Sequence, residues 1–204
     1  MADAFLTVKG HNGLPRIISI LSSLLERITS WNDDFTASDH QHYSPGSAVS
    51  AFSGLEKPQI SIPRYLERIF QFGHCSASCF AVAYIYLDRF LHLHPSVLVD
   101  SLNVHRFLIT AVLTAVKFME DRYYNNAYFA KVGGISLAEM NYLEVDFLFG
   151  LRFDLNVTPV VFASYCSILE REFDMADPQI PRSLHCLPTE EESSSSHKHN
   201  ELIV

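Results

Sequence analysis

The spacing of apolar side chains along the chain predicts helices. Between residues 14 and 28 large aliphatic side chains recur every three or four positions, which places them on one side of a helix. These side chains are Ile17, Ile18, Leu21, Leu24, Leu25 and Ile28. The chain then becomes polar and rich in Ser, Pro and Gly, so we expect residues 31–60 to form a linker with too little apolar surface to offset its ordering entropy.

Residues 61–173 carry a dense series of helix start and stop signals. Ser61 followed by Pro63 predicts the start of a helix, and Gly73 predicts its end. Further starts are predicted at Ser76 or Ser78, at Asn103, at Asn125, at Ser136 with Glu139, and at Thr158 with Pro159. Two of these helices, 79–93 and 104–118, are apolar on most faces, which is typical of helices enclosed by others. The pattern predicts an all-α bundle.

The same patterns divide the chain into five segments. They are a flexible N-terminal segment 1–13, an amphipathic helix 14–30, the polar linker 31–60, the helical bundle 61–173 and a tail 174–204. The tail combines prolines, a serine run and an acidic cluster, so we expect it to be disordered. A chain of 204 residues suits one domain with flanking segments.

Composition excludes several classes of function. The formal net charge of −8 and the absence of a basic run argue against nucleic-acid binding. The four cysteines lack zinc-site spacing, and we expect no metal and no cofactor. The first ten residues lack a signal-peptide layout and no apolar run is long enough to span a membrane, so we expect a protein of the nucleus and/or cytoplasm. The sequence contains no Gly-rich phosphate loop and no nucleophile elbow, so no motif of this kind indicates an enzyme.

Lys117 and Glu144 interrupt apolar helical faces. Lys117 ends an apolar run, and Glu144 lies on a seam whose other members are Leu137, Met140, Phe147 and Leu151. An isolated charge in such a place is costly unless it is paired. The alternative is that each side chain reaches solvent at a helix end, as lysine often does. Considering both charges together, we interpret them as an ion pair near a surface that meets a partner.

Asp88 is a third charge in an apolar setting, because it shares one helical stripe with Ala81, Tyr84 and Ile85. We predict that it forms a buried salt bridge with Arg64 or Arg89. Such a pair fixes how helices lie against each other without adding much stability.

Three segments resemble the signatures of a cyclin box. They are Tyr-Leu-Asp-Arg-Phe-Leu at 86–91, Ala-Val-Lys-Phe-Met-Glu at 115–120, and Leu143-Glu144 followed by Leu-Arg-Phe-Asp-Leu at 151–155. The resemblance spans residues 61–173. Asn-Val-His-Arg at 103–106, the segment 121–128 and Val-Gly-Gly-Ile at 132–135 are similar to plant P-type (U-type) cyclins, relatives of the fungal phosphate-signalling cyclins.

The resemblance implies a single five-helix cyclin box with one flanking helix on each side. It implies a non-catalytic subunit that binds and activates a cyclin-dependent protein kinase as a heterodimer, in cell-cycle or nutrient (phosphate) signalling. Within the box it implies an internal pair between Arg64 and Asp88. The residues that it assigns to kinase binding are Lys117, Glu144, Phe118, Glu120, Leu148, Phe153 and Leu155.

Two positions depart from the cell-cycle members of that family. Met119 stands where many cyclins have a second acidic residue, and the first box helix lacks the tryptophan of their substrate-docking patch. The alternative function is a cyclin-fold adaptor in transcription or signalling that does not activate a kinase. The presence of both Lys117 and Glu144 favours the kinase regulator.

Overall fold

The regular structure of the described residues consists of helices. The computed structural model describes residues 13–38, 51–121 and 125–174. Its seven helices are α2 (Arg16–Ser38), α3 (Ile62–Gly73), α4 (Ala77–Leu93), α5 (Val104–Met119), α6 (Asn126–Gly133), α7 (Leu137–Gly150) and α8 (Pro159–Asp174). The prediction of an all-α fold, with five box helices flanked by one helix on each side, is confirmed.

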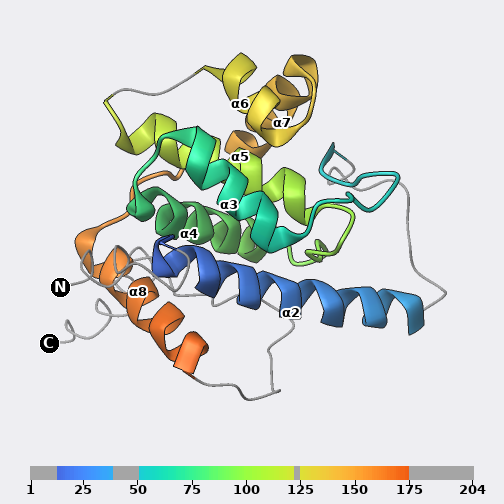
Figure 1. Ribbon diagram of the computed structural model, residues 1–204, viewed down its shortest axis with the longest axis horizontal. Coiled ribbons are helices and arrows are strands. Elements are labelled where there is room, and N and C mark those ends of the chain that lie inside the picture. Colours follow the sequence, from blue (N-terminus) through green and yellow to red (C-terminus); the bar gives the residue numbers. More distant parts are fainter. Residues whose placement is uncertain (1–12, 39–50, 122–124, 175–204) are drawn as a thin grey trace, which may run out of the picture.

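Two helices, α4 and α5, form the centre of the bundle. From Ala77 to Phe90 every residue of α4 is buried except Ser78 and Arg89, and from Val104 to Val116 every residue of α5 is buried except Arg106. The other helices enclose them: α2, α7 and α8 pack on α4, and α3, α6 and α7 pack on α5. Figure 1 shows α2 along one side of this centre and α6 and α7 on the opposite side.

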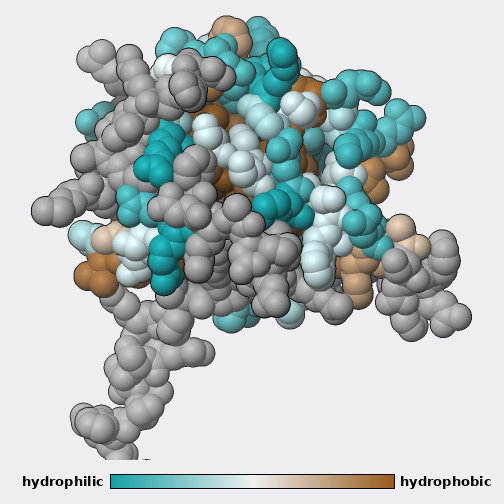
Figure 2. Space-filling view, turned by 60° about the horizontal axis from the view of Figure 1, so that its bottom comes forward, coloured by the Kyte–Doolittle hydropathy of each residue, from teal (hydrophilic) through white to brown (hydrophobic). Residues whose placement is uncertain are grey.

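The N-terminal flanking helix packs on the box, as its stripe of aliphatic side chains predicts. All six side chains of that stripe are buried, and α2 contacts α3, α4 and α8. Figure 2 turns the α2 side toward the viewer, and the placed side chains there are mostly pale or teal. The apolar stripe therefore faces the box, while Ser19, Ser23 and Glu26 lie on the exposed side of α2.

The helix continues past the predicted boundary at residue 30 as far as Ser38. Polar residues beyond that boundary bind the loop before α5 and so favour helix over linker. The Asn32 amide donates to the carbonyl of Val99 at 2.8 Å, and an Asp33 carboxylate oxygen accepts from the amide of Ser101 at 3.0 Å.

The end of the predicted linker is also anchored, since Phe52 is completely buried. Its ring stacks on Phe107 of α5, with ring centroids 4.2 Å apart and an interplanar angle of 5°. Close by, the amide of Gly54 donates to the carbonyl of Leu102 at 2.9 Å. Residues 1–12 of the N-terminal segment, residues 39–50 of the linker and the tail from residue 175 onward lie outside the described residues.

Most predicted helix starts agree with the structure, but their caps differ in detail. Asn125 and Ser136 cap α6 and α7 by accepting the amides of Tyr128 and Glu139. Ser61 stands at the start of α3, yet its hydroxyl makes no capping bond. The capping box predicted for α7 is only half formed, because the Glu139 carboxylate pairs with Arg106 instead.

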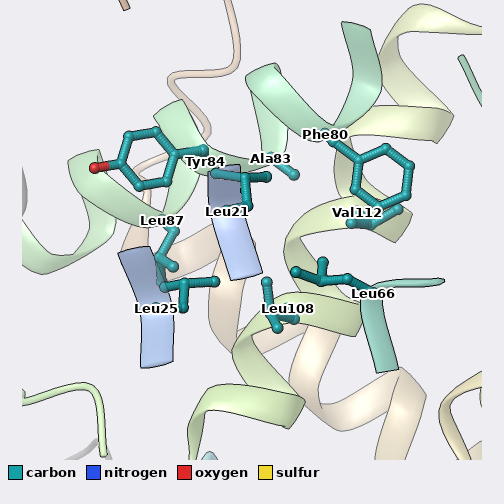
Figure 3. A pocket seen from close by; sticks show the side chains of 9 residues that line it. All are labelled: Leu21, Leu25, Leu66, Phe80, Ala83, Tyr84, Leu87, Leu108 and Val112. Atoms are coloured by element: carbon teal, nitrogen blue, oxygen red, sulfur yellow. The ribbon is translucent and has the colours of Figure 1, made fainter. Parts of the chain in front are cut away.

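A small apolar hollow lies between four helices. Figure 3 shows its lining, which is Leu21 and Leu25 of α2, Leu66 of α3, Phe80, Ala83, Tyr84 and Leu87 of α4, and Leu108 and Val112 of α5. The hydroxyl of Tyr84 points away from the other side chains. The hollow therefore offers no polar group to orient a ligand and belongs to the packed core. None of the described helices is both long and apolar enough to cross a membrane.

Gly150 permits the close contact between α7 and α4. A Cβ atom at position 150 would overlap the ring of Phe90, and that ring also stacks on Phe147 with centroids 5.2 Å apart. A side chain at this position would push the two helices apart.

We therefore expect Gly150→Ala to destabilise the protein by about 1–3 kcal/mol through overpacking. In an open helix the same change stabilises by up to about 1 kcal/mol, so the sign of the effect is diagnostic. Urea unfolding followed by circular dichroism measures it. An equal or higher free energy of unfolding would show that Phe90 moves aside without cost.

Candidate functional site

Lys117 and Glu144 form the predicted ion pair. Lys117 lies in the last turn of α5 and Glu144 in the middle of α7, and the Lys117 Nζ is 2.5 Å from the Glu144 Oε1. The side chains are 29% and 14% exposed, so both charges are partly removed from water while their pair stays at the surface. Two charges from neighbouring helices thus neutralise each other at one point.

A third side chain completes this site. The Asn126 amide nitrogen, at the start of α6, donates to the second carboxylate oxygen of Glu144 at 2.7 Å and to the Asn141 carbonyl oxygen at 2.8 Å. Both oxygens of Glu144 are therefore engaged, which fixes its rotamer. Asn126 could not be recognised as a site residue from the sequence, because an asparagine next to a helix cap carries no distinctive signal.

Exposed apolar side chains lie close in sequence to both members of the pair. Phe118, which follows Lys117, is 54% exposed, and the neighbouring Met119 is 41% exposed. On α7, Val145 and Phe149 are exposed beside Glu144 and the half-buried Leu148, and Phe153 is exposed just after the helix. We call this set the α5–α7 surface: Lys117, Phe118, Met119, Glu144, Val145, Leu148, Phe149 and Phe153. Apolar surface rimmed by polar groups is typical of a site that binds another protein.

Two residues predicted for kinase binding have other contacts. Leu155 is half-buried and packs against the core. The Glu120 carboxylate accepts from the Ser76 amide at 3.2 Å and from the Cys79 thiol at 3.3 Å. Both bonds hold the pKa of Glu120 below its usual value. Glu120 thus satisfies the start of α4, a long-range contact that the local pattern does not reveal.

The predicted pair between Arg64 and Asp88 is wrong. Arg64 is exposed in the first turn of α3, whereas Asp88 is 1% exposed. The Tyr165 hydroxyl of α8 donates to Asp88 Oδ2 at 2.6 Å, and Asp88 Oδ1 has no hydrogen-bond partner among the described residues. The alternative partner, Arg89, lies against Asp154 instead.

Burial raises the pKa of Asp88 to about 7, although the Tyr165 hydrogen bond opposes the shift. The predicted pairing is wrong because the Asp88 side chain points toward α8, whereas Arg64 lies on the solvent side of α3. Elsewhere in the described residues, no group of three or more His, Cys, Asp or Glu side chains is placed to hold a metal ion.

Comparison with known proteins matches residues 15–155 to the cyclin family. Cyclin-P4-1 of Oryza sativa subsp. japonica is 58% identical over 188 residues, which cover 90% of this chain and 88% of that protein. Cyclin-U4-1 of Arabidopsis thaliana is 49% identical over 197 residues, covering 94% and 96%. Cyclin-U4-2 of Arabidopsis thaliana is 52% identical over 162 residues, covering 79% and 73%. The matched span includes α2 and the whole α5–α7 surface.

The buried Asp88 makes a pH dependence testable. Because its pKa in the folded protein lies above the ordinary 3.8, the folded state keeps a proton that the unfolded chain releases. This contribution to stability is complete below about pH 4 and is lost as the pH rises to about 7. Asp88→Asn should therefore flatten the fall of stability across that range.

Urea unfolding of the wild type and Asp88→Asn at a series of pH values measures the difference. The comparison isolates Asp88 because all other carboxyls are common to both proteins. Parallel stability curves would contradict a protonated Asp88.

Proposed function

Because this chain belongs to the cyclin family, we propose that it binds and activates a cyclin-dependent protein kinase through the α5–α7 surface. Cyclins are regulatory subunits, and the chain accordingly has a regulatory role. The observation that carries the proposal is the Lys117–Glu144 pair, on two helices that also expose large apolar side chains.

The composition of this surface suits an apolar helical partner. Phe118, Phe149 and Phe153 would supply apolar contact area, since aromatic side chains dominate the binding energy of many interfaces. The ion pair adds no net charge, but its remaining hydrogen-bonding capacity would fix the partner's register. Asn126 already satisfies one oxygen of Glu144, so the carboxylate does not have to be ordered on binding.

Activation follows from selective binding. An active protein kinase needs an ion pair between its strand lysine and the glutamate of its mobile helix. A regulator that binds only this arrangement shifts the kinase population toward it. The rigid bundle beneath the α5–α7 surface favours such selection, because a surface on packed helices does not adapt readily to the inactive arrangement.

The process and the compartment are part of the same proposal. We expect a role in cell-cycle or nutrient (phosphate) signalling, in the nucleus and/or cytoplasm. The alternative is a cyclin-fold adaptor in transcription or signalling that does not activate a kinase. The presence of the intact pair favours the kinase regulator, since a purely apolar adaptor surface would have no need of two partly buried charges.

Kinase binding should depend on both members of the pair. We expect Lys117→Ala and Glu144→Ala each to cost about 2–5 kcal/mol of binding free energy, because each leaves a partly buried charge without its partner. Titration calorimetry against a panel of cyclin-dependent kinase catalytic subunits from Oryza sativa measures the loss. Circular dichroism checks that the variants stay helical.

A matched control is available on the same two helices. Arg106 and Glu139 form an ion pair near the N-terminal ends of α5 and α7, with Nε and Oε1 2.7 Å apart and side chains 25% and 32% exposed. Arg106→Met and Glu139→Gln should leave kinase binding unchanged. Wild-type affinity in both Lys117→Ala and Glu144→Ala would refute the proposed surface.

A further inference from the structure

The chain leaves α7 through a strained turn. Arg152 and Phe153 have φ angles of 52° and 58°, two successive left-handed residues of which neither is glycine. This conformation is strained for a residue that has a Cβ atom, and it persists only where the surroundings hold it. Burial of the Phe153 ring does not stabilise this conformation, since that side chain is 57% exposed. Its ring lies beside that of the exposed Phe149, with ring centroids 5.1 Å apart.

Two side chains of α4 bind the backbone that follows the turn. The Arg89 Nη1 donates to the carbonyl of Asp154 at 3.1 Å and to that of Asn156 at 2.9 Å, and lies 3.6 Å from the Asp154 carboxylate. The Tyr86 hydroxyl donates to the carbonyl between them, that of Leu155, at 2.7 Å. Three successive carbonyls are thus bound to one helix.

The turn also has its own hydrogen bonds, which end α7. The Phe153 amide donates to the carbonyl of Leu148 at 3.0 Å, and the Asp154 amide donates to that of Leu151 at 3.0 Å. These bonds set the local geometry, whereas Arg89 and Tyr86 fix it relative to α4. The combined result is that Phe153 stands beside Phe149 at the edge of the α5–α7 surface.

We propose that Arg89, assisted by Tyr86, is a positioning residue for partner binding: it clamps the left-handed turn that presents Phe153 to the kinase. This inference rests on the proposed function and specifies how one part of that surface is prepared. A turn ordered before binding loses less entropy when the partner docks. Lysine is not an equivalent replacement here, because its ammonium is a compact point charge on a shorter side chain, whereas the guanidinium is a planar group.

A double-mutant cycle separates positioning from general stability. With the kinase catalytic subunit that binds the wild-type chain, Arg89→Met should weaken binding about ten-fold in the wild-type background and by less than about two-fold in a Phe153→Ala background. In the wild-type background, the affinity of Arg89→Lys should lie between those of the wild type and Arg89→Met. Equal losses of affinity in both backgrounds would overturn the inference, because Arg89 would then act independently of Phe153.

A control variant and a second readout complete the test. Arg68 donates to the carbonyl of Lys131 at 3.1 Å and joins α3 to α6, so Arg68→Met should leave binding unchanged. In the free protein, Arg89→Met should speed amide hydrogen exchange of Phe153 and Leu155, whereas Arg68→Met should not. Unchanged exchange in Arg89→Met would overturn the clamp even if the kinase binds.

The failure of the proposed function would look different. If the wild-type chain binds no kinase, the docking role of Phe153 falls with it. Faster exchange in Arg89→Met would then identify the turn as clamped by α4 for structural reasons alone.

Discussion

The need to enclose α4 and α5 determines how the other helices are arranged. Neither helix has a polar side wide enough to face water, so α2, α3, α6, α7 and α8 must cover them. Of these, α7 is itself apolar on several sides, and only Met140, Leu143 and Phe147 are buried. Among its other apolar side chains, Leu137, Tyr142, Val145 and Phe149 remain exposed. The surface around Lys117 and Glu144 is therefore what is left after the core has been closed.

Partly or fully buried carboxylates are accommodated in two different ways. Glu144 keeps its partners at the surface, a lysine on one oxygen and an asparagine on the other. Asp88 lies deep between α4 and α8 with one hydroxyl donor, and burial raises its pKa. The first arrangement maintains a charge pair where a partner can meet it. The second joins two helices and leaves no charge on the surface.

The local sequence pattern predicted the features that depend on helical periodicity. It did not predict contacts between residues that are far apart in the sequence. Lys117 and Glu144 were recognisable because a charge on an apolar stripe needs a partner. The helical periodicity predicted that Asp88 is buried, but it could not show which helix packs against it. Its hydrogen bond with Tyr165 was therefore missed. Phe52 and the last turns of α2 were assigned to a linker because their anchors, Phe107 and the Val99 carbonyl, are distant in sequence.

The rate of phosphate transfer by the kinase tests the central claim most directly. The chain would be titrated into a purified cyclin-dependent kinase catalytic subunit while phosphorylation of a peptide substrate is followed. We expect a saturable rise in rate that reaches its plateau at one chain per kinase. Binding at that ratio without any rise in rate would contradict the claim and would identify the chain as an adaptor on the kinase.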